Sequence, residues 1–315
     1  MSEPAARSPS VDSPTAVAAL LAPEARERAY SPSSCIGGDY QPFIDAYVRE
    51  SEAAAQRASA LGGTWLWSAY GDAPSQRIAL CLPPRAAIRS PQKGAPLLVF
   101  IHGGYWQELS ALDSRFAAAA CVERGVAFAA VDYTLAPKAS VGAIVGECRA
   151  AMHWLAAHAH EWSIDASRIV VAGSSAGAHL AAMAALPGAT TMPPPAAVVL
   201  VSGIFELEPL IGTGINDALA MSAADARAQS PALAMLDGFA PALVAWGAVE
   251  TDAFKHQSRH FAAALGRAGT ACATLEVAAR NHFDVVLDLA DPSSALGRAT
   301  FERLCASVAP AHRPA

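Results

Sequence analysis

The sequence predicts an α/β fold in which a mostly parallel central sheet carries helices on both faces. Short, strongly apolar runs recur along the chain, at 97–101, 126–131, 169–172, 196–202 and 242–246. Continuous apolar runs of this kind are typical of parallel strands that are covered on both faces. Segments with helical periodicity separate the runs, and such an alternation builds a parallel sheet through right-handed crossovers.

The chain before the first buried strand is less regular. Residues 1–20 are rich in Pro, Ser and Ala, and we expect a flexible tail there. Residues 21–315 contain no segment resembling an inter-domain linker, so they are expected to form a single domain. Within it, the pattern predicts a first helix over 41–61 and paired edge strands over 64–67 and 78–82.

The remainder alternates strands and helices around one irregular excursion. Besides the runs above, the pattern predicts one further strand over 272–277 and helices over 113–124, 141–160, 254–267 and 294–308. Residues 203–238 interrupt this alternation with Pro and Gly residues and a short helical stretch at 216–228. Because excursions of this kind usually cover the carboxyl ends of parallel strands, where ligands bind, we predict a small lid.

Composition argues against several classes of partner. Only 16% of the 315 residues are charged and the net charge is −6, with no Lys/Arg cluster, so nucleic acid is not an expected partner. Although 53% of the residues are hydrophobic, no apolar run approaches the ~20 residues of a membrane-spanning helix, so no membrane association is expected. The six cysteines are scattered without metal-binding spacing, which indicates reduced thiols in the cytoplasm and no metal or other cofactor.

The segment Gly173-Ser174-Ser175-Ala176-Gly177 is the first candidate for catalytic chemistry. A β-branched apolar run precedes it and an Ala-rich segment with helical propensity follows it, which is the strand-turn-helix context of a nucleophile elbow. Ser175 is at the apex of this turn, and the flanking glycines allow the helix to pack back on the strand. Ser175 is therefore the predicted nucleophile.

A serine nucleophile also needs a base, which follows the acid in the chain order of this architecture. His282 comes directly after the last predicted strand, in a loop at its carboxyl end, and is the predicted base. The other histidines that follow Ser175 are expected in structural, surface or terminal positions: His179, His256, His260 and His312.

The predicted acid is Asp252, in the loop after the strand at 242–246. Its role would be to orient the imidazole and to stabilise the imidazolium that forms during the reaction. Glu250, two residues nearer the strand, and Asp284, close to His282, are the alternative carboxylates.

A glycine-rich turn at 102–106 follows the strand at 97–101 and supplies backbone N–H groups for an oxyanion. Gly103 and Gly104 are the expected donors in this turn, together with the N–H of Ala176 at the elbow. Tyr105 and Trp106 complete the turn and are expected to offer a flat apolar wall to a substrate.

Together these residues resemble the kynurenine formamidase (arylformamidase) branch of the α/β-hydrolase superfamily. The resemblance rests on the turn at 102–106, the elbow, and the pairing of Glu250-Thr-Asp252 with Asn281-His-Phe283. It extends from about Tyr30 to the C-terminal helix. Its sharpest element is Tyr105-Trp106, since related lipase-like esterases tend to carry a third glycine where this chain has Tyr105.

The resemblance implies an α/β-hydrolase fold and a metal-independent serine hydrolase that cleaves N-formylkynurenine to kynurenine and formate, a step of tryptophan degradation. Ser175, Asp252 and His282 would be its triad, and a formyl-enzyme its intermediate. A carboxylesterase of broad specificity for short-chain acyl esters is the alternative, because acyl-transfer machinery is common to both. A non-catalytic binding module would be expected to lack a triad member. The expected partners are a small-molecule formamide or ester and, in a homodimer, a second copy of the chain.

Overall fold

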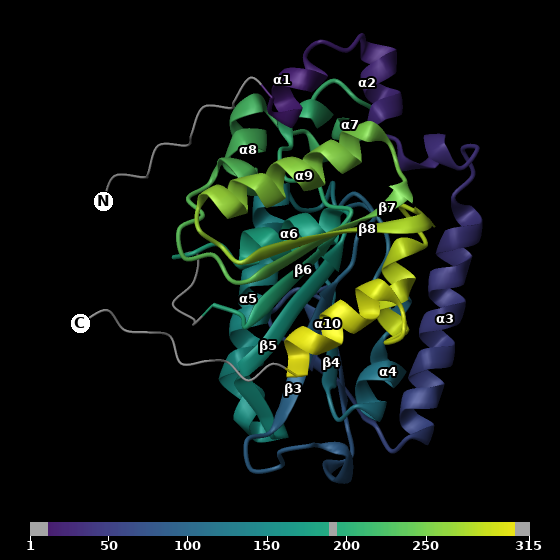
Figure 1. The fold of residues 1–315 in the computed structure, drawn as a ribbon, viewed down its shortest axis with the longest axis vertical. Helices are drawn as coiled ribbons and strands as arrows, with labels where there is room; N and C mark the ends of the chain where they lie inside the picture. Colours follow the sequence, from purple (N-terminus) through teal and green to yellow (C-terminus); the bar gives the residue numbers. More distant parts are fainter. Residues whose placement is uncertain (1–11, 189–193, 306–315) are drawn as a thin grey trace.

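A computed structural model describes residues 12–188 and 194–305 (Figure 1). Eight strands form one sheet in the order β1-β2-β4-β3-β5-β6-β7-β8. β1 is antiparallel to β2 and β2 to β4, whereas all other neighbouring pairs are parallel. The strands are β1 (Thr64–Ala69), β2 (Arg77–Leu82), β3 (Ala95–Ile101), β4 (Ala127–Val131), β5 (Ile164–Ser174), β6 (Ala197–Val201), β7 (Ala242–Val249) and β8 (Cys272–Asn281).

Helices cover both faces of this sheet, as the sequence predicts (Figure 1). One face carries α5 (Val141–His158), α6 (Ala176–Ala184) and α9 (Asp252–Arg267). The other carries α3 (Gln41–Ala60), α4 (Ala118–Glu123) and α10 (Ala295–Cys305). Because side chains alternate along a strand, β3 contributes Leu97, Val99 and Ile101 to the first core and Leu98 and Phe100 to the second.

Several predicted boundaries differ from the observed elements. The helix predicted over 113–124 is shorter, since a 3₁₀ turn, Leu112–Ser114, precedes α4. β5 begins before 169 and β8 continues beyond 277. β2 is not an edge strand, because β4 pairs with its free side. The last helix is described to Cys305, and residues 306–308 of its predicted range lie outside the described residues.

The prediction of a flexible tail over 1–20 is wrong for its described part. Pro14–Ala18 form helix α1, capped by the hydroxyl of Ser13, which accepts a hydrogen bond from the N–H of Ala16. The backbone N–H and hydroxyl of Thr15 donate to Oε2 of buried Glu206, at 3.0 and 2.6 Å. This anchor is distant in the sequence, so local composition gave no sign of it. Residues 1–11 lie outside the described residues.

The excursion at 203–238 forms four short helical segments. They are η5 (Glu208–Leu210), α7 (Asn216–Leu219), α8 (Ala223–Ala228) and η6 (Pro231–Leu233). A second short helix at the chain start, α2 (Pro23–Ala29), and the 3₁₀ turn η1 (Pro32–Cys35) lie between α1 and α3. Figure 1 shows α1, α2, α7 and α9 gathered at one end of the molecule.

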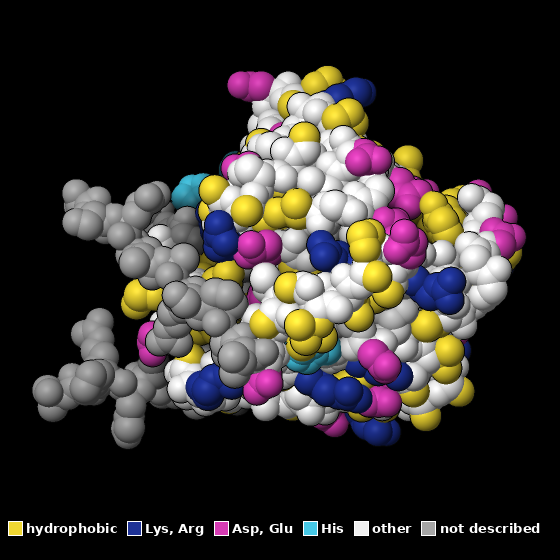
Figure 2. All heavy atoms as spheres, turned by 90° about the horizontal axis from the view of Figure 1, so that it is seen from above, with side chains coloured by type: hydrophobic (Ala, Val, Ile, Leu, Met, Phe, Trp, Pro, Cys, Tyr) yellow, Lys and Arg dark blue, Asp and Glu magenta, His cyan; other side chains and the backbone are white. Residues whose placement is uncertain are grey.

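The charged side chains on the surface are mixed in sign, as expected from a sequence without a Lys/Arg cluster (Figure 2). On the face shown in Figure 2, basic and acidic side chains are interspersed among hydrophobic ones. No helix within residues 12–188 and 194–305 is long and apolar enough to cross a membrane. The six cysteines, all of them described, are free thiols.

The glycines around the elbow allow β5 and α6 to pack closely. A Cβ atom on Gly177 would lie 2.0 Å from the carbonyl oxygen of Ile101 and 2.5 Å from that of His102. A Cβ atom on Gly173 would lie 2.2 Å from the carbonyl oxygen of Gly177. Backbone atoms cannot move aside as a flexible side chain can, so a side chain at either position would separate the helix from the sheet.

We expect Gly177→Ala to lower the free energy of unfolding by about 3 kcal/mol, because overpacking against backbone displaces α6. Urea denaturation measures the change. Gly146→Ala is the matched control: this glycine is in α5, where an added Cβ meets nothing within 4 Å. Helix propensity should make that variant about 0.5–1 kcal/mol more stable. Equal stabilities for the two variants would contradict the proposed close packing.

Candidate active site

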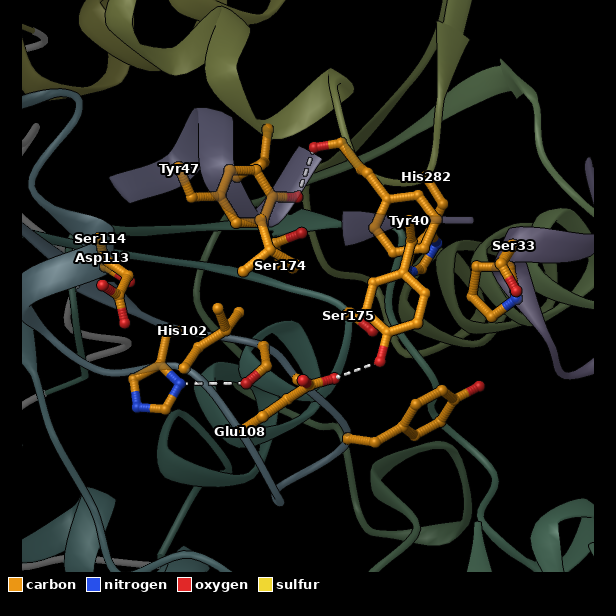
Figure 3. A pocket seen from close by; sticks show the side chains of 18 of the residues that line it. Ser33, Tyr40, Tyr47, His102, Glu108, Asp113, Ser114, Ser174, Ser175 and His282 are labelled. Atoms are coloured by element: carbon orange, nitrogen blue, oxygen red, sulfur yellow. Dashed lines mark hydrogen bonds between the residues drawn. The ribbon is translucent and has the colours of Figure 1, made fainter. Parts of the chain in front are cut away.

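A cavity of about 230 Å³ opens beside the elbow (Figure 3). Ser175 and His282 both line it, together with Gly103 and Gly104 from the turn after β3. The remaining wall comes mainly from residues 105–116 after the turn, from α3, from residues 27–40 before it, and from the residues just after β8. The carboxyl ends of β3, β5 and β8 therefore meet at one cavity, as expected for a parallel sheet.

Ser175 has the backbone conformation of a nucleophile elbow. Its φ of 55° and ψ of −121° are unusual for a residue with a side chain. Its N–H donates to the carbonyl of Val201 at 2.8 Å, which ties the elbow to the end of β6. The residue is 8% exposed and that exposure faces the cavity. The elbow glycines thus hold a hydroxyl at the cavity wall in a fixed position.

His282 contacts a buried carboxylate, that of Glu250. Nδ1 of His282 lies 3.1 Å from Oε2 of Glu250. The other oxygen, Oε1, accepts hydrogen bonds from the hydroxyl of Ser202 at 2.6 Å and from the N–H of Gly247 at 2.5 Å. Because the Glu250 side chain is fully buried, these donors replace water around the carboxylate. Nδ1–H is thereby fixed toward Glu250, and Nε2 is left for proton transfer.

The choice of Asp252 over Glu250 as the partner of His282 is corrected by this geometry. β7 continues to Val249, so Glu250 is the first residue beyond the strand and enters the core beneath the histidine. Thr251 then caps α9, and Asp252 is its exposed first residue. The other alternative, Asp284, accepts the N–H of Asn281 at 2.7 Å and closes the loop that carries His282.

The turn after β3 has its carbonyls on the side of Tyr133 and its free N–H groups on the opposite side. The hydroxyl of Tyr133 donates to the carbonyls of His102 and Gly103, at 3.0 and 3.1 Å. In a trans peptide the following N–H points the opposite way, so the N–H groups of Gly103 and Gly104 point away from Tyr133. Among the described residues, neither N–H donates to a backbone acceptor. The N–H of Ala176 is similarly available, at the first position of α6.

His102 holds this turn as a neutral residue. Its Nδ1 lies 3.0 Å from the Gly103 carbonyl, which can only accept, so Nδ1 carries the proton. The ring stacks on Tyr133 with centroids 4.2 Å apart. Burial lowers the pKa of His102 to about 4, despite the opposing effect of the Gly103 carbonyl. The ring therefore stays uncharged at neutral pH and positions the turn by hydrogen bonding and stacking.

Tyr105 and Trp106 have different surroundings. Tyr105 lines the cavity, and its hydroxyl donates to the carbonyl of Tyr30. Trp106 is fully buried, does not line the cavity, and packs edge-on against His179 at 5.1 Å. Of the two residues expected to wall the substrate, only Tyr105 lines the cavity. Both residues have positive φ, 49° and 61°, which is uncommon for residues with a side chain.

Helix α3 braces the loop that carries His282. The hydroxyl of Tyr47 donates to the carbonyl of Phe283. The ring of Phe283 stacks on Tyr40 and on Phe43, each with centroids 5.5 Å apart. The sequence pattern predicts the helix over 41–61 but does not show what it covers. Tyr40 and Tyr47 also line the cavity, so one helix both braces the histidine loop and walls the site.

The segment from Glu27 to Ser33 also walls the cavity, and the sequence analysis missed it. Thr251 fixes it by donating its hydroxyl to the carbonyl of Ala29 at 2.7 Å. Tyr30 is buried, which raises its pKa to about 12, and Gln257 donates to its hydroxyl at 3.4 Å. By contrast, only Ile215 of the predicted lid at 203–238 reaches the cavity wall.

Three other described histidines that follow Ser175 do not line the cavity: His179, His256 and His260. Nε2 of His179 lies 2.7 Å from the carbonyl of Gln229, and burial lowers its pKa to about 4. Nε2 of His260 lies 3.4 Å from Oε1 of Glu206. His312 lies outside the described residues. Within the described part of the chain, no three His, Cys, Asp or Glu side chains are grouped to hold a metal ion.

Comparison with known proteins agrees with this architecture. The sequence profile of the BD-FAE family matches residues 87–265. Kynurenine formamidase of Danio rerio is 30% identical over 257 residues, which cover 79% of this chain and 84% of the relative. The enzyme of Salmo salar is 30% identical over 278 residues, covering 84% and 90%. The chain belongs to the kynurenine formamidase family.

Solved structures share the fold of this chain. A structure from Silicibacter sp. is 28% identical, with a TM-score of 0.71 and coverage of 85% of this chain and 95% of that one. An esterase of Pyrobaculum calidifontis, 20% identical with a TM-score of 0.63, shares the fold. The α/β-hydrolase fold predicted from the sequence is thus confirmed. Within this family the chain is a hydrolase of the serine type.

Exchange of Glu250 for Gln should lower kcat for a p-nitrophenyl ester by roughly 10³- to 10⁴-fold, because an amide no longer fixes the imidazole or stabilises its charged form. Steady-state kinetics measure the loss. Asp252→Asn, which removes an exposed carboxylate two residues away, should leave kcat within about twofold of wild type. A larger loss of kcat in Asp252→Asn than in Glu250→Gln would support Asp252 as the acid, as predicted from the sequence.

Replacement of Tyr47 by Phe should lower both stability and kcat. Loss of one hydrogen bond to the Phe283 carbonyl is expected to cost about 1 kcal/mol of unfolding free energy. Because the adjacent His282 loses its brace, kcat should fall about tenfold while KM changes little. Urea denaturation and kinetics at a temperature where the variant is fully folded separate the two effects. A wild-type kcat in a destabilised variant would show that the brace does not position the histidine.

Proposed function

We propose that the protein hydrolyses the formamide of N-formylkynurenine, with Ser175, His282 and Glu250 as its triad. The observation that carries this proposal is the contact between buried Glu250 and His282. His282 and the elbow serine line the same cavity, which has aromatic walls. Membership of the kynurenine formamidase family supports the choice of substrate. The proposal retains the predicted nucleophile and base and replaces Asp252 by Glu250.

The proposed reaction has two halves. Ser175 Oγ attacks the formyl carbon while Nε2 of His282 takes its proton, and Glu250 stabilises the imidazolium. The N–H groups of Gly103, Gly104 and Ala176 would hold the developing oxyanion. His282 then protonates the departing arylamine, which leaves a formyl-enzyme. A water molecule, deprotonated by His282, releases formate and regenerates the serine. The protein groups account for every proton in this sequence, so the proposal needs no metal.

The cavity fits an aryl leaving group. A formyl group is the smallest acyl group, so the cavity volume is available mainly to the amine portion of the substrate. Seven Phe and Tyr rings line the cavity: Tyr30, Tyr40, Tyr47, Phe100, Tyr105, Phe116 and Phe283. Aromatic walls of this kind bind flat rings through offset or edge contacts. A carboxylesterase for short-chain acyl esters is the second candidate, because apolar Phe100, Phe116 and Val286 could accommodate a longer acyl chain.

The paired assay compares kcat/KM for N-formylkynurenine with kcat/KM for short-chain p-nitrophenyl esters. We expect the formamide to be preferred, and activity on it to persist after treatment with a metal chelator. Ser175→Ala should abolish both activities, lowering kcat by roughly 10⁶-fold if the serine is the nucleophile. Strong esterase activity with negligible formamide hydrolysis would replace the first candidate by the second. Unchanged hydrolysis in Ser175→Ala would refute the catalytic assignment itself.

A further inference from the structure

The cavity wall is lined by acidic but not by basic side chains. Three carboxylates line it, those of Glu27, Glu108 and Asp113, whereas none of its lining residues is Lys or Arg. Of the ion pairs between described side chains, none includes these three carboxylates. Glu27 and Asp113 are held by other groups of the protein, at 2.9 Å by the N–H of Gly214 and at 2.7 Å by the hydroxyl of Ser110.

Glu108 differs from these two in its position and its contacts. It follows the left-handed Gly104 by one turn, with its N–H donating to the Gly104 carbonyl at 3.1 Å. A Cβ atom on Gly104 would lie 2.8 Å from Cγ of Glu108, so the side chain packs directly against the turn that carries the free N–H groups. Its only side-chain partner among the described residues is the hydroxyl of Tyr40, which donates to Oε1 at 3.5 Å (Figure 3).

This arrangement suits an ammonium group of the substrate. Oε2 of Glu108 has no hydrogen-bond partner among the described residues, and the exposed side chain lines the cavity, so this oxygen is accessible to a bound ligand. A cationic ligand would supply a charge-assisted hydrogen bond where the protein supplies none. The rings of Tyr40 and Tyr105 in the same wall add cation–π attraction. An anionic group beside Glu108 would meet like charge, and no Lys or Arg side chain lines the cavity to offset it.

We propose that Glu108, with Tyr40, is the specificity-determining site for an ammonium group on the aryl leaving group. The inference rests on the proposed function, since it places this group on the amine portion of the formamide. N-formylkynurenine carries both an α-ammonium and an α-carboxylate. The ammonium binds at Glu108, whereas no Lys or Arg side chain of the cavity wall pairs with the carboxylate.

Two analogues of the substrate test the contributions of its ammonium and its carboxylate separately. The decarboxylated analogue of N-formylkynurenine keeps only the ammonium, and the deaminated analogue keeps only the carboxylate. We expect wild type to hydrolyse the first with at least tenfold higher kcat/KM than the second. In Glu108→Gln this ratio should fall about five- to tenfold, the range for loss of one partly solvated charge contact. Added salt should lower the wild-type ratio and have little effect on the ratio in the variant.

Glu50→Gln is the matched control, since Glu50 is an exposed carboxylate on α3 that does not line the cavity. Its ratio should equal that of wild type. If wild type shows no preference for the ammonium analogue, or if Glu108→Gln lowers both analogues equally, the inference is overturned.

Failure of the formamidase proposal would be seen separately, as hydrolysis of neither analogue. The same charge comparison is then made with phenyl acetates that carry a 2-aminoethyl or a 2-carboxyethyl group. A preference for the amine that depends on Glu108 would support the inference for an esterase. Its absence would overturn it.

Discussion

The close approach of α6 to the end of β3 is the constraint on which the site depends. Gly177 lies against the carbonyls of Ile101 and His102, which begin the turn that carries the free N–H groups. The same contact sets the distance between Ser175 and that turn, because Ser175 directly precedes α6 and the turn directly follows β3. Any expansion of this contact would therefore separate the proposed nucleophile from the proposed N–H donors.

The buried carboxylate behind His282 is the second such constraint. Burial of an ionised group is unfavourable unless hydrogen bonds compensate for lost water, and Glu250 obtains three of them. Two of the donors come from different strand ends, Ser202 after β6 and Gly247 within β7. The carboxylate therefore fixes these elements relative to one another as well as orienting the imidazole.

Much of this could be predicted from the sequence, because buried parallel strands and the elbow have strong local patterns. The identity of the acid could not. Glu250 and Asp252 are two residues apart, and which one enters the core depends on where β7 ends and α9 begins, a boundary set by packing. Helix α1 and the segment around Tyr30 were missed for a related reason. Their partners, Glu206 and Thr251, are far away in the chain, and only the folded structure brings them together.

Helix α3 links two tasks at one cavity. The proposed nucleophile, N–H donors and acid belong to the sheet and its turns, whereas Tyr47 belongs to a helix that precedes the sheet in the chain. Because Tyr47 both lines the cavity and holds the loop of His282, a substitution there would change leaving-group binding and the rate of attack together. Related proteins would therefore acquire new leaving-group preferences more readily at Ile44, which lines the cavity without a hydrogen bond to that loop.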